Sequence, residues 1–418
     1  MEKPVTYIPG SSARGWLVAS AGTGINLALG VLYTWSLFKG AIEQQFGWNG
    51  DQLNDPYALC CLVFAFTMIL AGRCQDLWGP RLTATLGGLL VGIGLVLIST
   101  TRSYLLWLVG FGILVGAGIG FGYASATPPA LKWFPAQRTG LIAGLVVSGF
   151  GLAPVYLAPL SQWLLNRFGV QQSMLMLGLG FVGMVCCLAQ LLVNPPASSA
   201  SLASASVSRE AARVNVADGN TPPREMLRQV RFWWLWLIYC IGAGAGLMVI
   251  GSISGMAKKS MGDWAFLAVA VLAVGNAGGR ILAGGVSDRI GRRQTLTLVL
   301  GLQALLMFVA IPVTGWPGVP GVWVVVVAAL MGANYGANLA LFPSFCKDLW
   351  GLRHFGTNYG LLFTAWGVGG LLLPRLQQTL TSYSGGSYTS AFVTAGALLI
   401  GAALLTLRWP STANPEPR

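Results

Sequence analysis

The sequence predicts an all-α membrane protein with 12 transmembrane helices in two pseudo-symmetric six-helix bundles. The chain has 418 residues, of which 55% are hydrophobic and 9% are charged, and it contains 57 glycines. This composition excludes an ordinary soluble domain. Twelve apolar runs are each long enough, at about 20 residues, to cross a bilayer. One loop motif also occurs twice, about half the chain apart, and this indicates an internal repeat.

The expected spans follow one another with short connections, apart from one longer polar segment in the middle of the chain. The spans are residues 16–39, 55–72, 81–100, 104–130, 139–164, 171–193, 232–257, 264–287, 294–314, 321–346, 357–379 and 389–408. The polar segment is rich in Ala, Ser and Pro and is typical of a linker. We therefore expect an N-terminal bundle over 1–193, a cytoplasmic linker over 194–230, a C-terminal bundle over 231–410 and a cytoplasmic tail over 411–418.

The net charge of +13 is explained by membrane topology rather than by binding to nucleic acid. If the N-terminus is inside, eighteen of the 25 Lys and Arg residues fall in cytoplasmic segments and Arg280 alone falls in the membrane. This bias predicts a multi-pass protein of the cell inner membrane, embedded in the lipid bilayer, with both termini cytoplasmic. The seven cysteines fall in helices or near cytoplasmic ends, so we expect no disulfide, no metal site and no cofactor.

Two tyrosines of the N-terminal bundle are candidates for lining a polar cavity. Tyr33 lies about two-thirds of the way along the first span, where an interfacial anchor is the alternative. In the fourth span, Gly112, Gly116 and Gly120 recur at four-residue spacing and indicate close packing against another helix. Tyr123 follows them at a depth where its hydroxyl needs a partner or water.

The loops after the second and eighth spans share the pattern G-x3-D-x2-G-x-R. The glycines permit close approach of helices, and the aspartate can cap a helix N-terminus or pair with a basic residue. The matching residues are Gly72, Asp76, Gly79, Arg81 and Gly284, Asp288, Gly291, Arg293. The pattern resembles the signature loop of the major facilitator superfamily, and the resemblance covers the whole chain. It implies that these loops latch the conformational change, a role compatible with that of a structural hairpin.

The segment 132–151, which leads into the fifth span, resembles a motif shared by monocarboxylate transporters and the oxalate:formate antiporter family. The residues that agree are Trp133, Phe134, Arg138, Leu141, Ala143 and Gly144. Lys132 and Arg138 suit topology and the latch better than substrate binding. Leu145, roughly 10 Å deep, is a candidate for an apolar wall of the site.

The eighth span contains the central candidate, Arg280. It lies eight residues before Asp288, which places it about 12 Å deep in a hydrocarbon core about 30 Å thick. An arginine at this depth costs about 3 kcal/mol on insertion scales and keeps its proton. Asn276 lies one turn earlier on the same face, so guanidinium and amide could bind one carboxylate together. A snorkelling or structurally paired arginine is the alternative.

The tenth and eleventh spans add two aromatic candidates. Small residues over 332–345 let Asn334, Tyr335 and Asn338 approach neighbouring helices. Trp366 lies near the middle of the eleventh span, away from the interfacial belt that tryptophan usually occupies. We expect Tyr335 and Trp366 to face the substrate cavity, with core packing as the alternative for Trp366.

The residues around Arg280 carry a further resemblance. The segment 276–280, Asn-Ala-Gly-Gly-Arg, is similar to the N-G-G-x-R pattern of oxalate:formate antiporters, while animal monocarboxylate transporters have an aspartate one turn before the same arginine. The resemblance implies a second cation in oxalate antiporters, a lysine on the eleventh helix, and the aligned position here is Trp366. Without that cation we expect a small monocarboxylate of the lactate or pyruvate type.

These observations lead us to expect a monomeric secondary active transporter that moves a small monocarboxylate with a proton, by alternating access around Arg280. The proton carrier is unassigned, with Asp263, Glu43 and Asp55 as candidates. The alternatives are an anion exchanger of the oxalate:formate antiporter type and a substrate-sensing receptor on a transporter scaffold. An enzyme is not expected, because the sequence places no nucleophile with a base and no metal cluster at membrane depth.

Overall fold

The computed structural model describes residues 13–195, 220–316 and 318–408. Most of the expected linker and all of the expected tail at 411–418 lie outside the described residues, and so do the side chains of Tyr33 and Asp263. The described helices are α1 (Ala13–Leu29), η1 (Gly30–Thr34), α2 (Trp35–Phe46), α3 (Gly50–Trp78), α4 (Pro80–Ser99), α5 (Tyr104–Trp107), η2 (Leu108–Val115), α6 (Gly116–Trp133), η3 (Ala136–Arg138), α7 (Thr139–Ala189), α9 (Pro223–Arg228), α10 (Val230–Met261), η4 (Gly262–Ala265), α11 (Phe266–Ile290), α12 (Arg292–Gly315), α13 (Gly321–Trp350), α14 (Phe355–Tyr383) and α15 (Thr389–Arg408).

The predicted twelve spans are confirmed within this described part. Ten stretches are long and apolar enough to cross a membrane. One of them, 136–189, holds two spans, because Gly169 has a φ of 72° and breaks α7 there. The remaining span is α14, which is long enough and carries more polar side chains than the others.

Two spans depart from regular α-helix. The first passes through the 3-10 turn η1 before it continues as α2, and at Gly30 an added Cβ would lie 2.1 Å from Cβ of Ala153 on α7. The fourth contains the π-helical segment η2. Such interruptions redirect a helix and often occur at functional positions.

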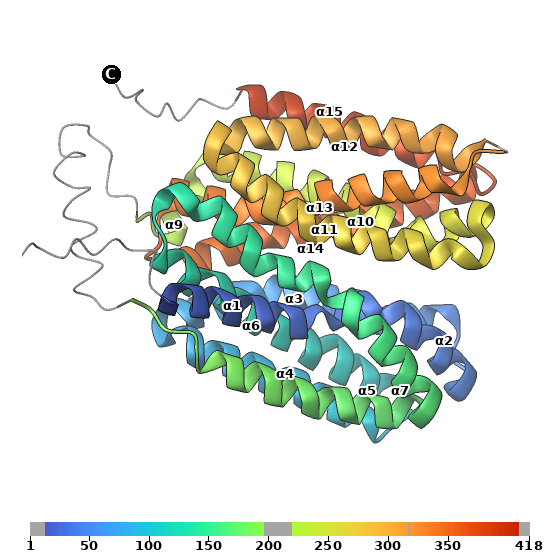
Figure 1. Ribbon diagram of the computed structural model, residues 1–418, viewed down its shortest axis with the longest axis horizontal. Coiled ribbons are helices and arrows are strands. Elements are labelled where there is room, and N and C mark those ends of the chain that lie inside the picture. The colour runs from blue at the N-terminus through green and yellow to red at the C-terminus, as the bar shows by residue number, and fades with distance from the viewer. Residues whose placement is uncertain (1–12, 196–219, 317, 409–418) are drawn as a thin grey trace, which may run out of the picture.

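The helices form two groups that lie side by side (Figure 1). The N-terminal group comprises α1 to α7, coloured blue to green, and the C-terminal group comprises α10 to α15, coloured yellow to red. The start of α1 and the end of α15 lie at the same end of the molecule, which we call the terminal end. The opposite end, which holds α2, is the distal end.

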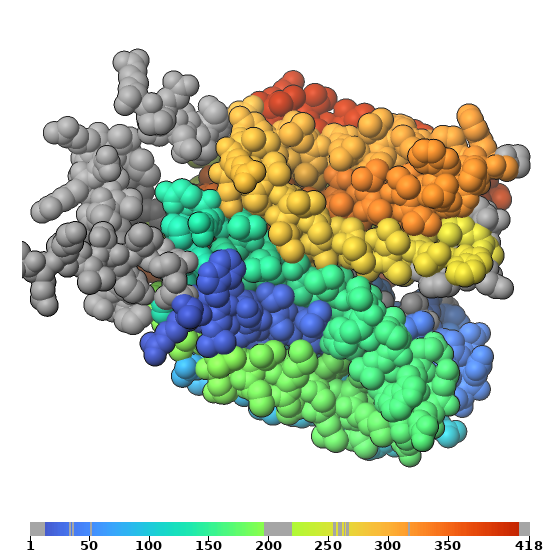
Figure 2. Space-filling model, in the orientation of Figure 1, coloured from blue at the N-terminus to red at the C-terminus, as the bar shows by residue number. Residues whose placement is uncertain are grey.

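Two helix pairs make the most extensive contacts between the groups: α3 packs on α14, and α7 packs on α11. Figure 2 shows the second pair on the face in view, with teal α7 against yellow α11. The approach is close because glycines lie at the crossings. A Cβ added at Gly144 on α7 would lie 2.2 Å from the carbonyl oxygen of Arg280, and one at Gly360 on α14 would lie 2.3 Å from that of Met68. Small residues of this kind are typical of helix contacts in membranes.

Candidate substrate-binding site and terminal latch

Arg280 is fully buried between the two groups of helices. Its Nε donates to Oδ1 of Asn276, one turn earlier on α11, over 3.0 Å. Its Nη1 donates to the carbonyl oxygen of Val147, which lies on α7 in the other group. The guanidinium therefore bridges the groups at the contact between α7 and α11.

The third nitrogen of this guanidinium, Nη2, is buried and has no hydrogen-bond partner among the described residues. The ion pairs of the described part of the chain both belong to Arg292, so no described carboxylate neutralises Arg280. A buried charge held only by neutral acceptors is costly. An anion with a planar pair of oxygens would supply the missing acceptor and the missing charge.

The position of Arg280 follows from the small residues around it. On α11, a Cβ added at Gly279 would lie 2.0 Å from the carbonyl oxygen of Ala333, so α11 packs closely on α13. On α13, a Cβ added at Gly336 would lie 1.9 Å from the carbonyl oxygen of Asn276, so this contact is equally close. Together with Gly144 on the α7 side, these contacts hold α11 between α7 and α13.

A layer of aromatic rings from both groups lies next to this site. Phe64 of α3 is its centre, because the Phe64 ring contacts four others with centroid distances of 5.1–6.0 Å. These rings belong to Tyr123, Phe150, Phe363 and Trp366. Phe150 precedes Gly151, where an added Cβ would lie 3.4 Å from Nε of Arg280. We call these five residues the aromatic layer; they offer an apolar surface beside the cation.

The structure brings part of the predicted site together in this layer. Tyr123 and Trp366 belong to it and are buried. Trp366 Nε1 donates to the hydroxyl of Tyr335 over 2.9 Å, which places Tyr335 directly behind the layer. Leu145 is half-buried, and its carbonyl oxygen accepts from the hydroxyl of Thr23 on α1.

The structure separates two of the predicted proton carriers from the site. Glu43 and Asp55 are exposed on the distal side, and Asp55 Oδ2 accepts from the hydroxyl of Tyr104 over 2.5 Å. Asp263 cannot be placed relative to Arg280, because its side chain is outside the described residues.

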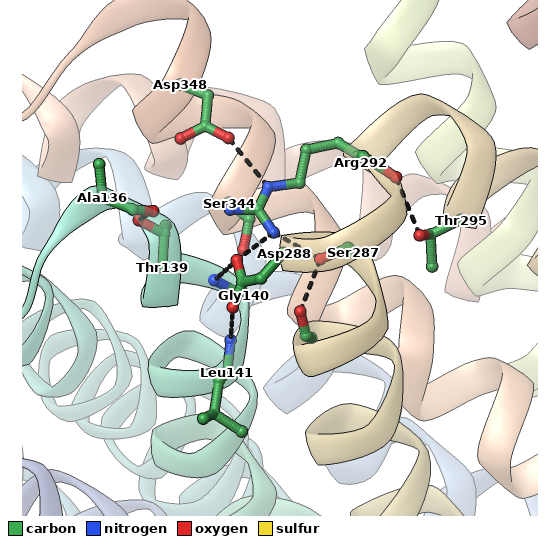
Figure 3. Close-up of polar contacts among 12 residues, drawn as sticks. Ala136, Thr139, Gly140, Leu141, Ser287, Asp288, Arg292, Thr295, Ser344 and Asp348 are labelled. Atoms are coloured by element: carbon green, nitrogen blue, oxygen red, sulfur yellow. Dashed lines mark hydrogen bonds and ion pairs between the residues drawn. The ribbon is translucent and has the colours of Figure 1, made fainter. Parts of the chain in front are cut away.

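At the terminal end, Asp288 joins the two groups (Figure 3). Its two carboxylate oxygens accept from the backbone N–H groups of Gly140 and Leu141, each over 2.8 Å, at the first turn of α7. Arg292 Nη1 lies 2.6 Å from Asp288 Oδ1, and Arg292 Nε lies 2.9 Å from Asp348 Oδ2. Asp288 thus caps a helix of one group while it pairs with a basic residue of its own group.

Asp76, which belongs to the N-terminal group, makes the equivalent contact with the C-terminal group. It accepts from the backbone N–H groups of Gly356 and Thr357 over 3.0 and 2.9 Å, at the first turn of α14. The glycines of the two motifs also match: a Cβ added at Gly72 would lie 2.0 Å from the carbonyl oxygen of Gly356, and one at Gly284 would lie 2.1 Å from that of Gly140. We call Asp76, Asp288 and the two helix starts that they cap the terminal latch.

The other motif residues have different surroundings. Gly79 and Gly291 have φ values of 86° and 96° and lie directly before α4 and α12, where only glycine adopts such a turn without strain. Arg81 and Arg138 are exposed. Arg293 Nε donates to the carbonyl oxygen of Thr406 over 2.8 Å at the end of α15.

Sequence reasoning missed several residues of the site and the latch. It selected Arg293, whereas Arg292 pairs with Asp288 across the turn at Gly291. It selected Leu145, whereas Gly144, Val147 and Gly151 contact Arg280. Their spacing of three and four residues marks one face of α7. Phe64, Phe150 and Phe363 carry no comparable signal.

Comparisons with known proteins agree with the architecture. The family model described as Major Facilitator Superfamily matches residues 17–374 and 267–418. The chain is 28% identical over 400 residues to the oxalate:formate antiporter of Oxalobacter formigenes, covering 92% of this chain and 89% of that protein. It is 26% identical over 417 residues to human monocarboxylate transporter 11, covering 96% of this chain and 84% of that protein.

A solved structure has the same fold. The proton:xylose symporter XylE, bound to a bromodeoxyglucose, superposes with a TM-score of 0.71 over 95% of this chain and 96% of that one. The sequence identity is 14%, so the likeness concerns the fold alone.

Proposed function

This chain belongs to the major facilitator superfamily, and on that premise we propose that it moves a small monocarboxylate, of the lactate or pyruvate type, together with a proton. The chain is a membrane transporter and not an enzyme. The substrate, the coupling ion and the roles of individual residues are our proposal.

The observation that carries the proposal is the free Nη2 of Arg280. A carboxylate oxygen at this nitrogen, with its second oxygen directed at Asn276, would satisfy the guanidinium fork. An opposite charge about 4 Å away is favourable by about 4 kcal/mol at an effective dielectric constant of 20. The oxalate:formate antiporter and monocarboxylate transporter names of the two relatives support an organic anion.

The aromatic layer supports one carboxylate rather than two. Trp366, at the position where the resemblance implies a lysine in oxalate antiporters, packs on Phe64 and Phe363 with centroid distances of 5.3 and 5.2 Å. A methyl or methylene group would contact these rings favourably, whereas a second carboxylate would lose its hydration without gaining a cation.

The terminal latch supports alternating access. It holds the groups together at the terminal end, and the positive-inside bias favours a cytoplasmic position for that end. We propose that this conformation is closed to the cytoplasm and that the groups rock about Arg280, as transporters built from repeats do. In this mechanism the latch must release before substrate leaves to the inside.

Coupling to a proton requires a carrier other than Arg280. An arginine side chain does not release its proton in a protein, so the coupled proton would accompany the substrate acid or another group. Anion exchange is the second candidate, because no described carboxylate neutralises Arg280 and one relative is named as an antiporter. The empty transporter would then change conformation only slowly, because Arg280 would remain a buried cation without a counter-charge.

The test is uptake of labelled lactate into proteoliposomes of the purified protein, with the membrane potential clamped. Symport predicts that a proton gradient directed into the vesicles, with the outside more acidic, drives uptake into vesicles that contain no substrate. Exchange predicts uptake only when the vesicles contain a counter-anion. If neither condition gives uptake of any monocarboxylate, the proposed substrate class is wrong.

The matched variants are Arg280→Ala and Arg289→Ala, which remove an arginine from the same helix. Arg289 is exposed at the end of α11. We expect Arg280→Ala to lower uptake by at least about 30-fold, since truncating a buried charge that binds its partner costs 2–5 kcal/mol. Arg289→Ala should stay near the wild-type rate. Lactate should raise the Tm of wild type and Arg289→Ala but not that of Arg280→Ala, which separates lost binding from lost folding.

A further inference from the structure

The equivalent arginines of the two repeated motifs have unequal surroundings. Arg293 is satisfied by the last turn of α15, where its Nε and Nη2 donate to the carbonyl oxygens of Thr406 and Leu407. A cation is favourable there because the C-terminal carbonyls of a helix carry partial negative charge. Arg81 is exposed, and within the described part of the chain its guanidinium forms neither a hydrogen bond nor an ion pair. The guanidinium of Arg81 is therefore available to a ligand, whereas that of Arg293 is bound within the protein.

Arg81 lines a cavity of about 320 Å³ at the terminal end of the N-terminal group. The cavity lies where the starts of α1 and α4 meet the end of α6 and the segment after α7. Its lining includes Arg14, Leu17, Arg81, Trp133, Gln190 and Leu191, and no acidic residue. Arg14 likewise has no acidic partner among the described residues. The volume lies within the range of small-ligand sites.

Apart from Asn194, the other polar side chains of the wall are already engaged, so the two guanidinium groups carry the formal charge of the lining. Trp133 Nε1 donates to the carbonyl oxygen of Val193 over 2.7 Å. Gln190 Nε2 donates to the carbonyl oxygen of Cys186 over 3.1 Å. In addition, α4 begins at Pro80 without a side-chain cap, so its N-terminal dipole adds positive potential beside Arg81. The cavity therefore favours an anion.

The rim of the cavity is apolar and exposed. Leu17 and Leu191 line the cavity and are 48% and 36% exposed, and Trp16 and Leu82, which adjoin lining residues in the sequence, are 43% and 56% exposed. They flank the arginines at the level where the membrane spans end, a position in which aromatic and apolar side chains contact lipid. An anion with an apolar body that continues along these side chains fits this surface better than a free inorganic anion.

We propose that this cavity binds the headgroup phosphate of an anionic phospholipid, with Arg14 and Arg81 as its ligands and the apolar rim against the acyl chains. Basic pockets between transmembrane helices on the cytoplasmic side are suited to such headgroups. Because Gly79 alone separates the end of α3 from the start of α4, the bound lipid holds the last turns of α3, which carry Asp76. The site is independent of the substrate site, and its test requires no transport.

The experiment is native mass spectrometry of the full chain with added phosphatidylglycerol or phosphatidylcholine. Two basic residues near a membrane surface should favour the anionic lipid by roughly 30-fold. The double variant Arg14→Gln with Arg81→Gln should lower the preference for phosphatidylglycerol over phosphatidylcholine to a few-fold or less. The control is Arg224→Gln with Arg228→Gln, which removes the same charge from exposed positions of α9 at the same end and should keep the wild-type preference.

Three outcomes would overturn the proposal. The cavity variant could keep the full preference for phosphatidylglycerol, or the α9 control could lose as much of it. Alternatively, inorganic phosphate could displace the bound lipid competitively at millimolar concentration, which would identify a free anion as the occupant. A Tm equal to that of wild type in lipid-free detergent shows that the cavity variant folds.

Discussion

The carboxylate of Asp288 accepts a 2.8 Å hydrogen bond from the backbone N–H of Gly140, the second residue of α7. These residues belong to different groups of helices, so the bond exists only while the terminal end is closed. Asp76 repeats it at the start of α14. The last turns of α3 and α11, which share one sequence pattern, thus use the same chemistry, a charge-assisted helix cap, to hold the groups together.

We predict that Asp288→Asn favours opening of the terminal end. An amide accepts at one oxygen only and loses the charge, and hydrogen bonds to charged groups contribute about 1.5–3 kcal/mol. The open population should therefore rise by roughly 10-fold or more. Spin labels at the exposed positions Gln137 and Arg289, in a cysteine-free background, report the opening as a longer distance by pulsed electron resonance. Asp55→Asn, at an exposed distal position, is the control; equal distance distributions for Asp288→Asn and wild type would refute the latch.

The two latch aspartates should act independently on one equilibrium. Asp76 and Asp288 contact different helices, and changes at separate sites usually add in free energy. The double variant Asp76→Asn with Asp288→Asn should therefore raise the ratio of open to closed molecules by the product of the two single effects. The same spin-label distances measure it. A double variant no more open than either single variant would mean that each aspartate closes the terminal end only in the presence of the other.

Much of this architecture could be predicted from the sequence because the membrane imposes strong patterns. Runs of about 20 apolar residues identify spans, and a motif repeated at half the chain length identifies two related halves. A lone arginine at membrane depth stands out for the same reason: little else there is charged. The spacing of Asn276 and Arg280 also placed them on one face, and the structure joins them by a hydrogen bond of 3.0 Å.

Contacts between the groups could not be predicted in the same way. The hydropathy of α7 is the same on several faces, so nothing in the sequence alone indicates that the carbonyl oxygen of Val147 meets Arg280. Backbone acceptors and donors carry no residue signature, and the same holds for the N–H of Gly140 beneath Asp288. Phe64 is one of many phenylalanines in apolar runs, and only the packing of α3 on α14 makes it the centre of the aromatic layer.

Gly284→Ala should block closure of the terminal end, whereas Gly285→Ala should not. A Cβ at Gly284 would lie 2.1 Å from the carbonyl oxygen of Gly140, a backbone atom that cannot move aside alone. A Cβ at Gly285 would meet only a side-chain carbon of Leu141 at 3.7 Å, an ordinary contact. Overpacking typically costs 1–3 kcal/mol, so uptake should fall by about 10-fold for Gly284→Ala, with a longer spin-label distance across the terminal end. Wild-type uptake by Gly284→Ala would show that the close contact is dispensable.

Trp366→Lys should shift the preference of the transporter from monocarboxylates towards dicarboxylates. The new ammonium group would lie among Phe64, Phe363 and Tyr335, where its desolvation is unfavourable unless an anion neutralises it. A second carboxylate about 4 Å away would return about 4 kcal/mol at an effective dielectric constant of 20. Competition of oxalate against labelled lactate should therefore improve by at least about 10-fold relative to wild type. Trp366→Phe, which removes the hydrogen bond to Tyr335 and adds no charge, should leave the selectivity unchanged. If it shifts the selectivity as much as the lysine does, the packing of the aromatic layer and not the missing cation determines which anion is carried.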